Sequence, residues 1–73
     1  MPTTSQILKM LKTMETFPDC DIEEVFTKNN IPKVRVRYLH TLGHFEVTDL
    51  TKNKQVSYND YNEIVHLVKE ILK

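Results

Sequence analysis

The stretch from Lys33 to Leu50 constrains the fold most, because polar and apolar side chains alternate strictly along two runs within it. The first run alternates cations with apolar residues in the order Lys33, Val34, Arg35, Val36, Arg37 and Tyr38. A period of two is typical of a strand that buries one face and leaves the other in water. Residues 45–48 alternate in the same way. The stretch is therefore predicted to form two half-buried strands.

A four-residue loop, 40–43, joins these strands into a predicted hairpin, and Gly43 at its end can adopt the positive φ that such a loop needs. One register keeps the apolar residues together, and it pairs Tyr38 with Phe45, Val36 with Val47 and Arg37 with Glu46. A slip by one residue would turn a glutamate into the core and is disfavoured. The same register brings Asp49 opposite Val34, and a bulge that turns Leu50 inward is the expected repair.

Two amphipathic helices are predicted at the ends of the chain. The first carries its apolar stripe on Ile7, Met10, Leu11 and Met14, follows a flexible tail over 1–4, and ends by Phe17 because Pro18 restricts the residue before it. Its N-cap is expected at Thr3, Thr4 or Ser5. Asn59 or Asp60 is expected to cap the last helix, and Asp60 with Glu63 has the spacing of a capping box. Its stripe consists of Tyr61, Ile64, Val65, Val68, Ile71 and Leu72.

The segment 22–30 is open to two interpretations. Asp21 and Glu24 have the spacing of a capping box, which favours a short helix. Alternatively, Glu24 to Thr27 forms a strand, and Asn29-Asn30 turns the chain into the strand that begins near Lys33. We favour the strand, because a lone hairpin is marginal in water and needs a further partner. Pro32 should then lie at an edge, a bulge or a strand entry.

The remaining segments complete one α+β domain over 1–73. Residues 18–21 are expected to form a loop, residues 51–54 a polar turn, and Gln55 to Tyr58 a short strand with Val56 and Tyr58 inward. The predicted architecture is an antiparallel meander sheet of three or four strands, with both terminal helices packed on one face. The other face would carry Lys33, Arg35, Arg37, Glu46, Thr48, Gln55 and Ser57.

Composition narrows the functional classes. The ten acidic and ten basic residues sum to zero, which argues against the broad cationic field of a non-specific nucleic-acid binder. A domain of 73 residues buries only about 60% of its unfolded surface, which leaves little room for a large pocket. A single cysteine, Cys20, and the lack of a long apolar run predict a reduced, cytoplasmic, soluble protein with no membrane contact.

Several short motifs resemble the YkuJ-like family of small bacterial proteins of unknown function. The motifs are Phe26 with Asn29-Asn30, Tyr38, the run Phe45-Glu46-Val47-Thr48, and Tyr58 with Asn59-Asp60. Where that family tends to have Asn-Gly, this chain has Asn-Asn, and its N-terminal third gives little to match. The resemblance implies an α+β fold of one sheet and helices, and it supports the strand over Glu24 to Thr27. It implies no catalytic residues.

No catalytic or metal site is predicted. His40 and His44, with Cys20 or His66, are too few and badly spaced on a loop for zinc. Cys20 lies between Asp19 and Asp21, whose negative charge opposes the thiolate that a nucleophile needs. We therefore expect a non-enzymatic chain without a cofactor or a small-molecule substrate.

The best candidate binding residues are Lys33, Arg35, Arg37 and Glu46 on the polar sheet face. We expect a protein-interaction or regulatory module of unknown partner, including self-association through this face or an edge strand. The alternative is a nucleic-acid-binding module that uses the same basic face. Acidic residues at the start of the last helix and inward-facing aromatic side chains argue against it.

Overall fold

The computed structural model describes residues 2–16 and 23–73. In chain order its elements are α1 (Thr4–Thr16), β1 (Glu23–Lys28), β2 (Ile31–Leu39), β3 (His44–Asp49), β4 (Lys54–Tyr58) and α2 (Tyr61–Ile71). The four strands form one open antiparallel meander in the order β1-β2-β3-β4. This α-β-β-β-β-α order confirms the predicted fold class.

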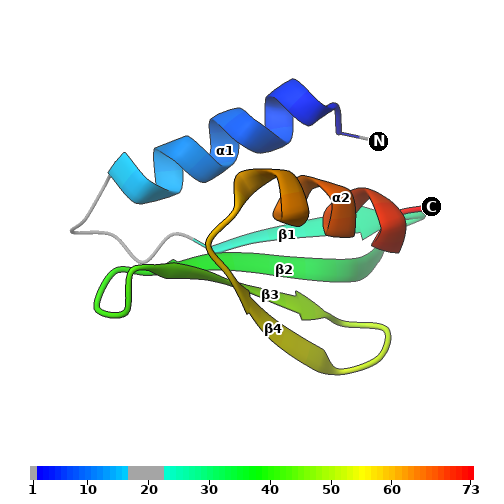
Figure 1. Ribbon diagram of the computed structural model, residues 1–73. Helices are drawn as coiled ribbons and strands as arrows, with labels where there is room; N and C mark the ends of the chain where they lie inside the picture. The colour runs from blue at the N-terminus through cyan, green and yellow to red at the C-terminus, as the bar shows by residue number, and fades with distance from the viewer. Residues whose placement is uncertain (1, 17–22) are drawn as a thin grey trace.

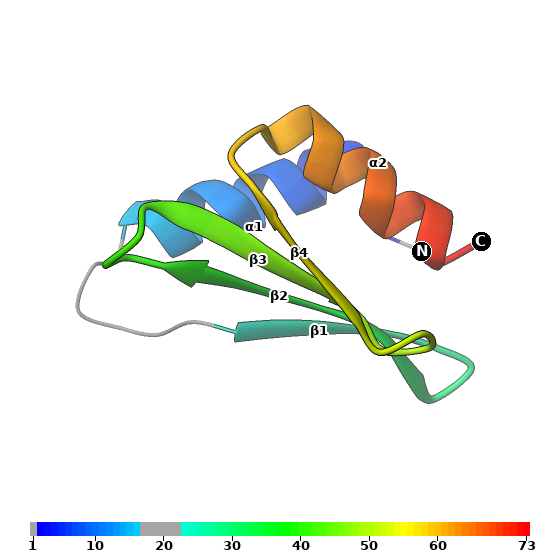
Figure 2. The ribbon, with the colours of Figure 1, turned by 60° about the horizontal axis from the view of Figure 1, so that its bottom comes forward.

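Both helices lie on one face of the sheet and run in opposite directions, so that the start of α1 lies near the end of α2 (Figure 1). Neither of the two helices in the described part of the chain covers the other face (Figure 2). The core consists of Ile7, Leu11 and Met14 from α1, Val34, Val36, Phe45 and Val47 from the sheet, and Ile64, Val65, Val68 and Leu72 from the last helix and its C-cap. Almost all of these residues belong to the apolar stripes that the sequence predicts.

The β2–β3 hairpin has the predicted register. Tyr38 pairs with Phe45, and Arg37 pairs with Glu46. The loop 40–43 ends in Gly43 at φ +70°, and the Gly43 amide donates to the Leu39 carbonyl at 2.7 Å. A positive φ suits glycine because it has no Cβ.

The segment that the sequence left open is a strand, β1. Asn29 and Asn30 have φ values of +54° and +65°, as a type I′ turn requires. A β-bulge interrupts the β1–β2 ladder: Thr27 pairs with Pro32, but Phe26 pairs with Val34. Pro32 therefore lies beside a bulge, which is one of the positions expected for it. The bulge also turns Phe26 toward the helices, where the side chain packs against the core.

The bulge predicted at Leu50 is wrong. Asp49 does pair with Val34, and the ladder continues without a shift to the Leu50 amide, which donates to the Lys33 carbonyl at 2.9 Å. The Asp49 carboxylate instead accepts hydrogen bonds from the Thr51 amide at 2.9 Å and the Thr51 hydroxyl at 2.5 Å. These bonds, the hydroxyl bond foremost, lower the pKa of Asp49. The loop therefore satisfies the carboxylate and no bulge is needed.

Both helix starts are capped at predicted residues. The Thr3 hydroxyl accepts from the Gln6 amide at 3.2 Å, and the Gln6 side chain accepts from the Thr3 amide at 2.9 Å. Helix α1 thus begins inside the segment expected as a tail. Asp60 caps α2 by accepting from the Asn62 amide at 2.8 Å. The expected loop 18–21 and the position of Phe17 lie outside the described residues.

Polar contacts join the two helices at both ends. The Lys69 ammonium donates to the Thr4 hydroxyl, which ties the end of α2 to the start of α1. At the other end, Tyr61 forms a hydrogen bond with Glu15. Burial, together with this bond, raises the pKa of Tyr61 to about 12.

The Tyr61 phenol should make stability sensitive to alkaline pH. Its folded-state pKa lies above the ordinary value of 10.0, so its contribution is fully present below pH 10 and is lost as the pH rises toward 12. In urea unfolding over this range, the free energy of unfolding of wild type should fall by about 1–2 kcal/mol more than that of Tyr61→Phe. Parallel curves for the two proteins would contradict this assignment.

Candidate functional site

The face of the sheet that points away from both helices is here called the outer face. It carries the side chains that alternate with the core along the strands: Glu23, Val25, Lys33, Arg35, Arg37, Glu46, Thr48, Gln55 and Ser57. Two rows cross it in register: Glu23, Arg37, Glu46 and Ser57 in one, and Val25, Arg35, Thr48 and Gln55 in the other. All four candidate residues from the sequence thus lie on this face, with Lys33 at the bulge.

A buried carboxylate lies at the centre of the first row. Glu46 is only 5% exposed, although α1 and α2 both lie on the opposite face of the sheet. Arg37 Nε donates to Glu46 Oε1 at 2.6 Å, and Gln55 Nε2 donates to Glu46 Oε2 at 2.7 Å. A shielded carboxylate needs such donors, because burying an unpaired charge is costly. Arg37 and Gln55 therefore hold Glu46 in one position across three strands.

The second row has unused hydrogen-bonding capacity. Arg35 lies directly opposite Thr48, but no hydrogen bond joins them. Within the described part of the chain, Arg35 Nε and Thr48 Oγ1 are buried and have no hydrogen-bond partner. Arg35 Nε lies 3.6 Å from Glu23 Oε1, and both side chains are more than a third exposed. An exposed pair of this length contributes little to stability.

Two residues of this face were not predicted from the sequence. Glu23 and Val25 lie on it only because the β-bulge shifts β1 by one residue relative to β2. Val25 is 43% exposed beside Arg35, so the face has an apolar margin next to its cations. Pro32 is compatible with a bulge, but its position in the sequence does not determine which strand gains the extra residue.

Within the described part of the chain, the other sequence candidates do not assemble into a site. Among residues 2–16 and 23–73, no group of three or more histidine, cysteine, aspartate or glutamate side chains could hold a metal ion. His40 packs edge-on against the Tyr38 ring at 4.6 Å between centroids. Cys20 lies outside the described residues. No helix in the described part of the chain has the length and apolar character needed to cross a membrane.

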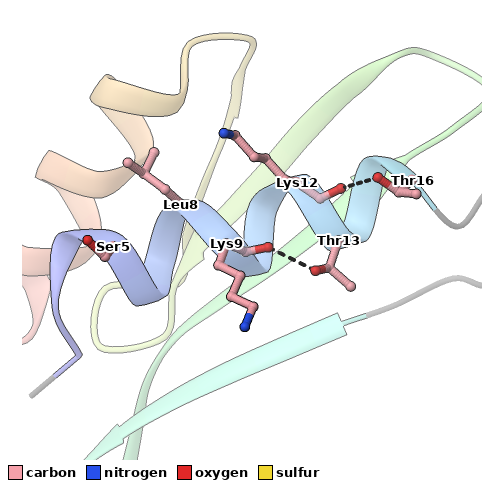
Figure 3. A pocket seen from close by; sticks show the side chains of 6 residues that line it. All are labelled: Ser5, Leu8, Lys9, Lys12, Thr13 and Thr16. Carbon is pink, nitrogen blue, oxygen red and sulfur yellow. Dashed lines mark hydrogen bonds between the residues drawn. The ribbon is translucent and has the colours of Figure 1, made fainter.

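A depression of about 440 Å³ lies along the surface of α1 (Figure 3). The described residues that line it all belong to that helix: Ser5, Leu8, Lys9, Lys12, Thr13 and Thr16. The Thr13 and Thr16 hydroxyls donate to the carbonyls of Lys9 and Lys12 at 2.9 and 2.7 Å, so these donors are already used. Among residues 2–16 and 23–73, no second element lines the depression, so nothing in this part of the chain closes it over a ligand.

Comparison with known proteins found no matching family model, no matching curated protein and no matching solved structure. The resemblance to the YkuJ-like family therefore stays a prediction.

Proposed function

We propose that this chain is a non-enzymatic protein-binding module whose outer face binds an acidic segment of another protein. The observation that carries the proposal is the second row of the outer face. Arg35 there has a buried Nε without a hydrogen-bond partner, next to a buried Thr48 hydroxyl in the same condition. Buried polar groups are normally satisfied, and a partner that supplies the missing bonds gains their energy.

A carboxylate is the group that best fits Arg35. The guanidinium donates in a planar fork that matches the two oxygens of a carboxylate. Arg37 is committed to Glu46 at 2.6 Å, whereas Arg35 lies 3.6 Å from an exposed glutamate that a partner could displace. Lys33 adds a further positive charge on the same strand. Exposed Val25 beside Arg35 offers an apolar contact to the same segment.

The chemistry of the face also supports binding over catalysis. The buried hydroxyl of Thr48 faces Arg35, which stays protonated and cannot act as a base. Nucleic acid is the weaker partner, because base stacking needs exposed aromatic rings. Tyr38, Phe45 and Tyr58 all lie on the helix side.

The experiment measures the fluorescence anisotropy of three labelled probes: a glutamate-rich peptide, a lysine-rich peptide of the same length, and a single-stranded oligonucleotide. Wild type is compared with Arg35→Glu and with Lys12→Glu, which changes the net charge equally but lies on the exposed face of α1. We expect wild type and Lys12→Glu to bind the acidic peptide, and Arg35→Glu to bind it at least about tenfold more weakly.

Equal binding by all three proteins would show that Arg35 is not part of the binding surface and would refute the proposal. Tighter binding of the oligonucleotide than of the acidic peptide would favour the nucleic-acid alternative. A salt series separates these outcomes further, since affinity for nucleic acid falls steeply with salt concentration.

A further inference from the structure

We propose that the chain also forms a twofold-symmetric dimer in which the free edge of β4 pairs antiparallel with β4 of a second copy. The pairing would join two four-stranded sheets into one continuous sheet. This inference is independent of the proposed function, because it rests on the backbone of an edge strand and on a groove beside α2. The outer face of each copy would stay open to a partner.

The pairing of β2, β3 and β4 determines which residues of β4 direct their backbone groups toward β3. The Leu50 amide donates to the Lys33 carbonyl, so residues 33 and 50 form a hydrogen-bonded pair. Such pairs alternate along antiparallel strands. Glu46 and Thr48 therefore bond toward β2, while Phe45, Val47 and Asp49 bond toward β4. Their partners are Tyr58, Val56 and Lys54.

Gln55 and Ser57 consequently direct their backbone N–H and C=O groups away from β3, at the sheet edge. This arrangement is self-complementary. In an antiparallel pair centred on Val56, Gln55 of one copy exchanges both backbone bonds with Ser57 of the other, and the same exchange recurs across the axis. The two Val56 side chains then face each other as a non-hydrogen-bonded pair. Val56 is 36% exposed, so this contact would bury apolar surface.

The opposite edge of the sheet is less suited to self-pairing. By the same alternation, Glu23 and Val25 direct their backbone groups outward from β1. Pairing them across a twofold axis would place Glu24 directly opposite Glu24, which is destabilising. The bulge at Phe26 and Thr27 interrupts the other half of this strand. Bulges are one way in which proteins protect an edge from pairing.

A groove beside β4 adds charge complementarity. It has a volume of about 410 Å³ and is lined by Tyr58, Asn62, Glu63, His66 and Leu67. The register centred on Val56 places Lys54 of one copy opposite Tyr58 of the other, on the helix side of the sheet. Lys54 can then reach Glu63 of the other copy. Within one chain, residues 54 and 58 are about 13 Å apart along the strand, so Lys54 lies far from the groove beside its own Tyr58. The ion pair with Glu63 therefore forms between copies and favours the dimer.

Sedimentation equilibrium of the full chain at millimolar concentration gives the first test. We expect wild type to be a dimer and Ser57→Pro to be a monomer, since proline removes an outward donor but no bond to β3. Val25→Pro is the matched control, because it removes the outward donor at the other edge. It should dimerise like wild type. Amide exchange at Gln55 and Ser57 should also slow as the wild-type concentration rises.

A charge exchange gives the sharper test. The proposed contact joins residue 54 of one copy to residue 63 of the other and occurs twice in the dimer. In a Lys54→Glu dimer both contacts would bring two glutamates together, and in a Glu63→Lys dimer both would bring two lysines together. Each variant alone should dimerise at least about tenfold more weakly than wild type. An equimolar mixture should recover the dimer, because the mixed pair replaces like-charge contacts with an attraction between opposite charges. A monomeric wild type, or variants that dimerise like wild type, would overturn the proposal.

Discussion

Replacing Phe45 by alanine should lower the free energy of unfolding by about 3–5 kcal/mol, the usual range for truncating a buried phenylalanine. Phe45 is 1% exposed and is the largest fully buried side chain among the described residues. Its ring lies 4.7 Å from the Tyr38 ring and 5.8 Å from the Tyr61 ring, so it joins β2 to α2 across the core. A domain this small has little stability in reserve. We therefore expect Phe45→Ala to be largely unfolded at physiological temperature.

Leu42→Ala is the matched control, because Leu42 lies only three residues away and is 65% exposed. Its free energy of unfolding, measured by urea denaturation, should stay within about 0.5 kcal/mol of wild type. Equal losses for the two variants would mean that Phe45 does not anchor the core, and the packing of the helices on this face would be wrong.

The second large effect concerns the Arg37–Glu46 pair. Arg37→Leu should lower the free energy of unfolding by about 2–3 kcal/mol, because among the described residues it leaves the buried Glu46 carboxylate with Gln55 as its one side-chain donor. The value lies below the range for fully buried pairs, since the Arg37 side chain is 43% exposed. Urea denaturation at neutral pH measures the loss.

A double-mutant cycle separates the pair from the packing of its side chains. If the cost arises from the unpaired carboxylate, Arg37→Leu combined with Glu46→Leu should be about as stable as Glu46→Leu alone, or more so. Strictly additive losses would show that Arg37 and Glu46 are not coupled, and would contradict the buried ion pair.

The strict alternation of polar and apolar residues made much of the fold predictable. Along β2 and β3, only one register keeps Val36, Tyr38, Phe45 and Val47 together, and the structure has that register. The apolar stripes of α1 and α2 predicted their buried faces for the same reason. Patterns of this kind are dictated by the burial of apolar side chains, which is the main driving force of folding.

Features set by one extra residue or one side-chain bond were harder to predict. The bulge in β1–β2 inverts the faces of β1, so Glu23 and Val25 reach the outer face instead of the core side. The bond from Thr51 keeps Asp49 in the ladder where a bulge was expected. The same holds for the candidate site. The alternation of polar and apolar residues predicted that Arg35, Arg37 and Glu46 share one face. It did not predict that Arg37 Nε bonds to Glu46 while Arg35 Nε has no hydrogen-bond partner among the described residues.

Chemical-shift mapping by NMR tests the central claim, that the uncovered sheet face is the partner surface, most directly. The protein is titrated with the glutamate-rich peptide, and its amide and guanidinium signals are recorded. We predict that the largest shifts cluster at Val25, Arg35 and Thr48, with the Arg35 Nε–H signal moving furthest. Shifts confined to the helices, or an Arg35 signal that does not move while the peptide binds, would contradict the account.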